Sequence, residues 1–303
     1  MLIYKNGRFT AQRSLRRLVA ALALMGPLVV AAVVGASSVA ATSATAAPKA
    51  AATSAAPKAG GSGSSLADAT SRTFRSASTG QVGRYHLWAS GLDTSRPIGL
   101  MLQFHGDGAY EFDNPGSSYS LGGAKGLRNE AQRHNMILVA LRSPDSGSPV
   151  WWRGGERKAD YVKDLVEQVV YAHYNVAKDR SWLVGYSGGA EFVTRYLVPK
   201  HSSLFGGGGA VLFGGGGKPA VRAASFSSSF ITAFPMYWYT GASDDGTCAD
   251  SDYDALGDAN EGSSSYRAKG FRVTLDTPAG VCHDLSGRFG PVTGKRLDLR
   301  YAS

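Results

Sequence analysis

The sequence has little cysteine, no cluster of histidines and no dense run of basic residues. Only two of its 303 residues are cysteines, and the six histidines do not gather around them. Two cysteines without clustered histidines make a poor zinc site, so no metal is expected. Nucleic-acid binding has no support either, because no patch of Lys and Arg interleaved with aromatic residues occurs.

The formal net charge of +9 arises mostly at the amino terminus. The first 17 residues contain no acidic residue and five basic ones, Lys5, Arg8, Arg13, Arg16 and Arg17. Removing these five from the 32 basic residues leaves 27 against 23 acidic residues, a charge of +4 for the rest.

This basic start precedes an apolar run over residues 18–40, which ends in small residues. The pattern predicts a secretory signal peptide over 1–47, cut after Ala46 or Ala47. The apolar run is also long enough to span a bilayer, so an uncleaved membrane anchor is the alternative. After cleavage we expect a secreted, extracellular protein with no membrane contact.

Two further parts follow the signal. Residues 48–66 consist of Ala, Ser, Gly, Pro and Lys, a composition typical of a flexible linker. Residues 67–303 are long enough for one domain with one sizeable core.

Apolar patterning in that domain predicts an opening hairpin followed by alternating strands and helices. Residues 71–90 read as the hairpin, with Thr79-Gly80 at its turn. Apolar runs predict strands at 97–106, 136–141, 181–187, 210–214 and 236–241, and the alternation in 271–277 predicts the last strand. Helical spacing predicts helices at 124–135, 159–176, 188–198 and 254–270. This alternation predicts an α/β fold, a doubly wound and mostly parallel sheet with an antiparallel hairpin at its start. Two four-glycine runs, 206–209 and 214–217, read as mobile or tightly packed turns around a strand.

A candidate nucleophile lies in "LVGYSGGAEF", residues 183–192. Gly185-Tyr186-Ser187-Gly188-Gly189 fits G-x-S-x-G, a sharp turn that lifts the serine hydroxyl above the sheet. The pentapeptide alone is a weak signal in a glycine-rich chain. Its setting is stronger, because a strand is predicted before it and an amphipathic helix after it.

A serine needs a base, and the base needs an orienting acid. On this fold the order along the chain is serine, acid, histidine. His283 follows the last predicted strand and is the preferred base, whereas His201 reads as a surface residue at a helix end. His105 precedes the serine and is expected to be structural, bonded to backbone.

The acid is expected after the strand that ends at Gly241. Asp244 and Asp245 both stand there, and Asp244 is preferred because of its spacing from Gly241. Asp284 remains a third candidate.

The two cysteines flank these positions, since Cys248 follows the acids and Cys282 directly precedes His283. An even count in a secreted protein predicts one disulfide between them. It would tie the acid loop to the histidine loop.

The remaining site residues are expected around the serine. The backbone N–H groups of Gly188 and Asp107 are the predicted oxyanion donors, with Gly108 the alternative to Asp107. Trp151 and Trp152 lie in the loop 143–158, which could cover the site, and flat aromatic rings suit ester substrates. Tyr186 completes the candidates for substrate contact.

Four segments, "QFHGDG", "GYSGGAE", "GASDD" and "GVCHDL", together resemble the α/β-hydrolase superfamily. The resemblance is closest to secreted serine esterases of the polyhydroxybutyrate depolymerase and feruloyl esterase type. It implies hydrolysis of small or polymeric carboxylic esters through an acyl-enzyme, without metal or organic cofactor. Carried over, Ser187 is the nucleophile, His283 the base and Asp244 (or Asp245) the acid. A lipase or peptidase on the same fold, or an inactive hydrolase-fold binding protein, are the alternatives.

Overall fold

The computed structural model describes residues 66–222 and 224–301. The predicted signal peptide 1–47 and nearly all of the predicted linker 48–66 lie outside the described residues. Among the residues described, no helix combines the length and apolarity needed to cross a bilayer.

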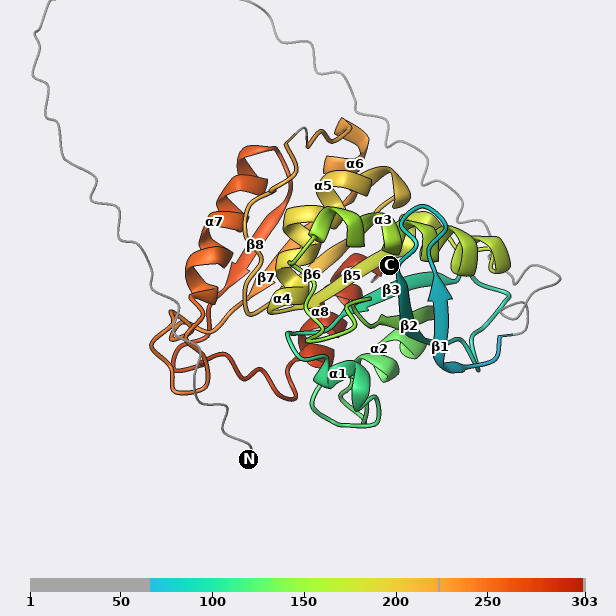
Figure 1. The fold of residues 1–303 in the computed structure, drawn as a ribbon, viewed down its shortest axis with the longest axis horizontal. Coiled ribbons are helices and arrows are strands. Elements are labelled where there is room, and N and C mark those ends of the chain that lie inside the picture. Colours follow the sequence, from blue (N-terminus) through green and yellow to red (C-terminus); the bar gives the residue numbers. More distant parts are fainter. Residues whose placement is uncertain (1–65, 223, 302–303) are drawn as a thin grey trace, which may run out of the picture. The chain divides into compact units, whose positions relative to one another are not determined.

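One eight-stranded sheet runs through the described residues, in the order β1-β2-β4-β3-β5-β6-β7-β8 (Figure 1). Its strands are β1 (Ala69–Arg75), β2 (Val82–Trp88), β3 (Gly99–Phe104), β4 (Met136–Leu141), β5 (Ser181–Tyr186), β6 (Gly208–Phe213), β7 (Met236–Tyr239) and β8 (Val273–Asp276). Strand β2 pairs antiparallel with β1 and β4, and the other pairs are parallel. The predicted hairpin and mostly parallel sheet are therefore confirmed.

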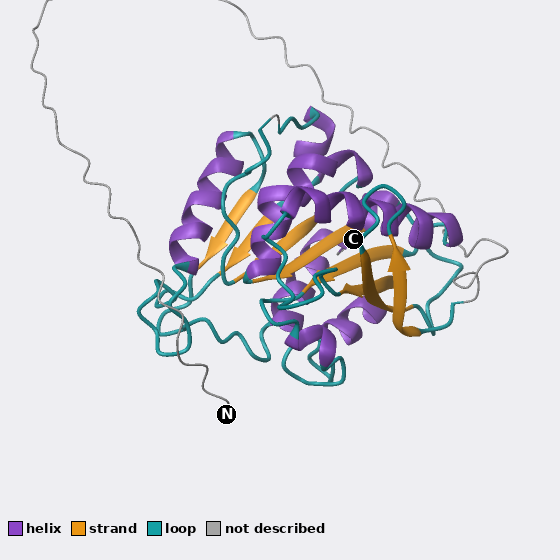
Figure 2. Cartoon of the chain, viewed as in Figure 1, coloured by secondary structure: helices purple, strands orange, loops and turns teal. Residues whose placement is uncertain are grey.

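Helices cover the sheet on both faces (Figure 2). They are α1 (Tyr110–Asp113), α2 (Leu127–Arg133), α3 (Gly155–Leu165), α4 (Gly188–Phe192), α5 (Val198–His201), α6 (Ser228–Ala233), α7 (Ala255–Ala268) and α8 (Phe289–Tyr301). Wider π-helical turns extend α3 over Val166–Tyr171 and join α4 to α5 over Val193–Leu197, and short 3-10 turns occupy Lys178–Arg180 and Ser202–Leu204.

Alternation along the strands creates two cores, because successive side chains point to opposite faces. On β5, Leu183 belongs to the core cluster that also contains residues of α3, α4 and α7, while Trp182 and Val184 belong to the cluster that contains residues of α2 and α8. Both faces are apolar, which explains the continuous apolar runs of the central strands.

Sequence patterning missed three helices, α1, α6 and α8. The largest miss is α8, whose few apolar residues are diluted by Gly290 and Gly294. It is nevertheless anchored, because Phe289 packs 4.8 Å from the ring of Phe213 and 5.2 Å from that of Tyr186. Tertiary contact rather than helical periodicity therefore fixes this element.

Candidate active site

Ser187 occupies the sharp turn between β5 and α4. Its backbone has φ 51° and ψ −120°, a strained conformation for a residue other than glycine. The Ser187 N–H donates to the Phe213 carbonyl at 2.8 Å, which holds the turn. A Cβ on Gly185 would lie 2.7 Å from the Gly189 carbonyl oxygen, and one on Gly189 would collide with the Phe104 carbonyl. The small residues on either side of Ser187 are thus required by close backbone approach.

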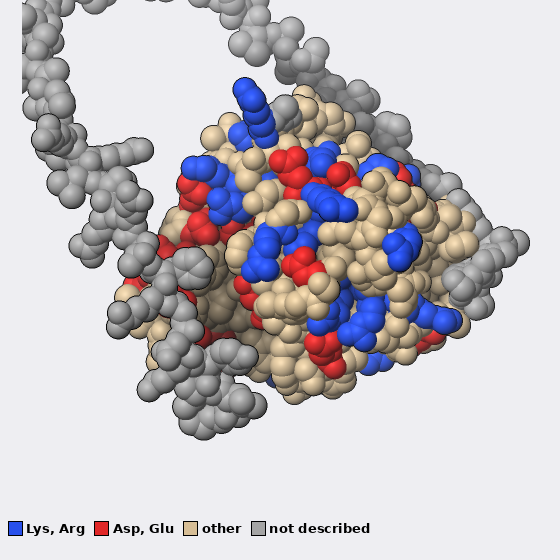
Figure 3. Space-filling view, viewed as in Figure 1, with Lys and Arg blue, Asp and Glu red and all other residues tan. Residues whose placement is uncertain are grey.

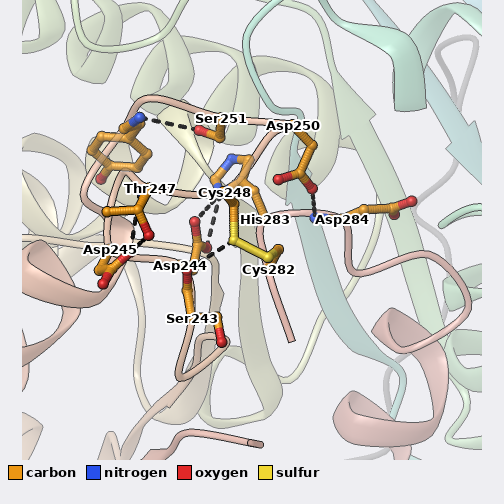
Figure 4. Close-up of a disulfide and its surroundings, with 11 residues drawn as sticks. Ser243, Asp244, Asp245, Thr247, Cys248, Asp250, Ser251, Cys282, His283 and Asp284 are labelled. Atoms are coloured by element: carbon orange, nitrogen blue, oxygen red, sulfur yellow. Dashed lines mark hydrogen bonds and ion pairs between the residues drawn. A yellow bond between two sulfur atoms is a disulfide. The ribbon is translucent and has the colours of Figure 1, made fainter. Parts of the chain in front are cut away.

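Two hydrogen bonds connect Ser187 to the predicted base and acid. His283 Nε2 lies 3.0 Å from Ser187 Oγ. On the other side of the ring, His283 Nδ1 lies 2.9 Å from Oδ2 and 3.1 Å from Oδ1 of Asp244. Asp244 is fully buried, so its carboxylate is fixed against the imidazole (Figure 4).

The other two acid candidates are turned to local backbone groups. The exposed Asp245 accepts the hydroxyl and N–H of Thr247 at 2.6 and 3.1 Å, and Figure 4 shows it away from the imidazole. Asp284 accepts the N–H of Ser286 at 2.8 Å. Among these three carboxylates, only Asp244 contacts His283.

The other two histidines weighed for the site serve structural roles. His201 pairs with Asp160 at 2.8 Å. His105 donates from Nδ1 to the Gly106 carbonyl at 2.6 Å and accepts the Ser143 N–H at Nε2 at 3.0 Å. Complete burial lowers the pKa of His105 to about 3, so its ring is neutral and bridges two loops.

The structure separates the two candidates for the second oxyanion donor. The Gly108 N–H donates to the Pro149 carbonyl at 3.1 Å and is therefore engaged. In the described part of the chain no acceptor takes the N–H of Asp107. The turn after β3, which carries Asp107, is held by Glu111, whose carboxylate accepts the Gly106 N–H at 3.1 Å. Sequence reasoning missed Glu111.

Ser187 opens into a pocket of about 680 Å³ between α4, α7 and the loop before α7. Its lining is Asp107, Trp152, Tyr186, Ser187, Gly188, Glu191, Arg195, Tyr196, Ser251, Tyr253, Asp258 and His283. The lining mixes aromatic rings with four charged side chains. This is large enough for a small ligand.

Only one of the two predicted substrate tryptophans reaches this pocket. Trp152 is 44% exposed, and its Nε1 donates to Asp107 Oδ2 at 2.9 Å. Trp151 is 0% exposed and stacks on Phe192 with ring centroids 4.8 Å apart. The expectation for Trp151 was wrong, because the chain turns this ring into the core beneath the loop.

Tyr186 lies beneath His283 rather than projecting toward a substrate. The two rings stack at 5.3 Å, and the Tyr186 hydroxyl donates to the His283 carbonyl at 2.9 Å. Tyr119 in turn donates its hydroxyl to that of Tyr186 at 3.2 Å. The Tyr186 hydroxyl is therefore occupied, and only part of its ring faces the pocket.

Glu191 links three segments around the pocket, its own helix, the glycine turn 214–217 and the loop of Tyr253, and the sequence analysis missed it. Its Oε1 accepts the N–H groups of Gly216 and Gly217 at 2.7 and 2.9 Å and the Tyr253 hydroxyl at 2.8 Å. Its Oε2 accepts from Arg195 at 2.8 Å. The second glycine run is thus a tightly packed turn. One sequence signal could have pointed to Glu191: it is a charged residue beside Phe192, in a helix otherwise rich in apolar and small residues.

The predicted disulfide between Cys248 and Cys282 is present, with the two Cα atoms 6.0 Å apart. It joins the loop of Asp244 to the loop of His283 across 34 residues of chain (Figure 4). A closure of this length is worth about 3–4 kcal/mol through the entropy of the unfolded chain.

We expect the double variant Cys248→Ser, Cys282→Ser to melt about 10 °C lower than the native chain, measured by calorimetry. Its kcat should also fall, because the acid and histidine loops lose their common anchor. An unchanged melting temperature together with unchanged kcat would contradict this role for the disulfide.

The strand order and the strained turn bearing Ser187 define the α/β-hydrolase fold, which this chain adopts. Solved structures with a similar fold include a thermostable esterase. Its TM-score is 0.52 at 16% sequence identity, and the match covers 76% of this chain and 61% of that one. A carboxylesterase from Bacillus cereus is similar at a TM-score of 0.50 and 15% identity, covering 72% of this chain and 95% of that one. No protein-family model matches the sequence, and no curated protein matches it.

Proposed function

We propose that this protein is a serine hydrolase that cleaves carboxylic esters through an acyl-enzyme intermediate. The observation that carries the proposal is the hydrogen-bonded chain from Ser187 Oγ through His283 to the buried Asp244, set on a strained turn. The fold it shares with the thermostable esterase and the carboxylesterase adds support. A metal or organic cofactor has no part in this reaction.

The proposed reaction begins with attack of Ser187 Oγ on the ester carbonyl carbon, while His283 Nε2 takes the hydroxyl proton. Asp244 keeps the remaining ring proton on Nδ1 and stabilises the imidazolium. The N–H groups of Gly188 and Asp107 donate to the oxyanion, and each donor is worth about 3–4 kcal/mol of barrier. His283 then protonates the departing alcohol, and a water hydrolyses the acyl-enzyme by the same route in reverse.

A panel of esters tests the reaction class. The purified protein should release p-nitrophenol from short p-nitrophenyl esters, and a fluorophosphonate probe should label Ser187. Triglycerides, feruloyl esters, polyesters and peptides in the same panel separate an esterase from a lipase or peptidase. Absence of labelling in folded protein would favour the inactive binding protein instead.

We also propose that the chain is secreted, with 1–47 removed as a signal peptide. The supporting observations are the basic start, the apolar run and small-residue end, and a disulfide, which is typical of oxidising compartments. Amino-terminal sequencing of protein recovered from the medium would locate the cut. Protein held in membranes with its first residues intact would instead support the anchor.

A further inference from the structure

The charges around Ser187 do not balance. The pocket lining holds three carboxylates, Asp107, Glu191 and Asp258, against one arginine, Arg195. Glu191 is compensated by Arg195 and by two backbone N–H groups, which donate to it, and it shares the Tyr253 hydroxyl with Asp258. Asp258 shares two of these partners, since it accepts the Tyr253 hydroxyl at 2.9 Å and lies 3.9 Å from Arg195. Two carboxylates thus divide one arginine, and Asp107 stands apart from all of them.

Asp107 is the most informative of the three, because it stands over the nucleophile turn. A Cβ on Gly188 would collide with Asp107 Oδ1, so this oxygen lies close to the Cα of Gly188, the residue whose N–H is one proposed oxyanion donor. Trp152 fixes Oδ2 through its Nε1 at 2.9 Å. Over the described ranges, Oδ1 has no hydrogen-bond partner and the carboxylate has no ion pair.

Asp107 is exposed at the pocket mouth, where Trp152 orients its carboxylate and no described residue pairs with it as a cation. Loss of water raises the pKa of Asp107, because the ionised form is the one that burial penalises. A fixed negative charge also opposes the oxyanion that forms beside it during ester attack. Both costs disappear if the substrate itself brings a positive charge next to Asp107.

Asp258 and the loop before α7 extend the negative charge beside the pocket. Burial and the neighbouring Glu191 raise the pKa of Asp258. No Lys or Arg occurs over residues 223–266, which carry seven acidic residues: Asp244, Asp245, Asp250, Asp252, Asp254, Asp258 and Glu261. Figure 3 shows acidic side chains bordering the hollow beside α7.

Three cations around the pocket are paired with carboxylates. Arg195 is bound to Glu191, and Lys158 is buried against Asp145 at 2.7 Å. Lys218 pairs with Glu261 at 2.6 Å. Arg153 lies over one face of the Trp152 ring, 5.4 Å from its centroid, and its charge acts on Asp107 without forming an ion pair among the described residues.

We propose that the pocket selects esters that carry an amine or quaternary ammonium group close to the scissile bond. Asp107 and Asp258 supply the charge, and the rings of Trp152 and Tyr253 supply aromatic surface suited to a cation. The acidic loop attracts such substrates to the mouth. This inference rests on the proposed ester hydrolysis.

Acetylcholine and 3,3-dimethylbutyl acetate form the matched test pair, because they differ in one charged nitrogen. With the purified protein, we expect kcat/KM at least about tenfold higher for acetylcholine, measured by acid release. The ratio should shrink between 50 and 500 mM salt, as screening predicts. Equal values for the two esters, or a preference for the uncharged one, would overturn the inference.

Three variants test which carboxylates cause the preference for acetylcholine over the uncharged ester. Asp107→Asn keeps the backbone N–H and should reduce the ratio about tenfold, and Asp258→Asn should reduce it less. Asp179→Asn, an exposed carboxylate at the opposite end of the strands, should leave the ratio unchanged. An unaltered ratio in Asp107→Asn would remove this residue from charge selection.

p-Nitrophenyl acetate separates the two ways of failing. If it is cleaved but acetylcholine shows no advantage, ester hydrolysis stands and charge selection is wrong. If no ester is cleaved at all, the proposed function itself fails.

Discussion

Ser187→Ala is expected to reduce kcat by at least about 10⁴-fold, because no other group can form the acyl-enzyme. The melting temperature should change little, since Oγ contributes one hydrogen bond, to His283. Hydrolysis of p-nitrophenyl acetate with purified variant protein measures the loss.

The matched control is Ser251→Ala. Ser251 also lines the pocket, and among the described residues its hydroxyl bonds only the Tyr253 N–H, which it accepts at 3.2 Å. Its removal should alter kcat by no more than a few-fold. If Ser187→Ala kept more than a few per cent of native turnover, Ser187 would not be the nucleophile.

Asp244→Asn is expected to reduce kcat by about 10⁴-fold, a loss of the size found when a triad carboxylate becomes an amide. The amide cannot stabilise the imidazolium, and its NH₂ group favours the wrong tautomer of His283. Circular dichroism should show a folded protein, because the side-chain volume is preserved.

Asp245→Asn is the adjacent control, since this exposed side chain binds Thr247 alone within the part of the chain that the structure describes. It should keep kcat within a few-fold of the native value. A larger loss in Asp245→Asn than in Asp244→Asn would reverse the assignment of the acid.

Local sequence predicted the sheet and the strained turn at Ser187 well, because both depend on short-range rules. The apolar runs fixed where buried strands lie, and Gly185 and Gly189 flank Ser187 as backbone packing requires. The order of serine, acid and histidine then limited the partners to a few positions.

Other features depended on contacts between distant segments. Helix α8 has a weak pattern of its own and is held by packing of Phe289 against Phe213. Glu191 is buried because the glycine turn 214–217 and Tyr253 arrive from elsewhere in the chain to bind it.

The sequence by itself determined the fold class, the strained serine turn, His283 and the cysteine pair. Only the tertiary structure decided between neighbours of the same type. Asp244 faces the imidazole while Asp245 binds Thr247, and Trp152 reaches the pocket while Trp151 enters the core. The reason is physical, since adjacent side chains point in different directions and the packing around the loop sets which one faces the site.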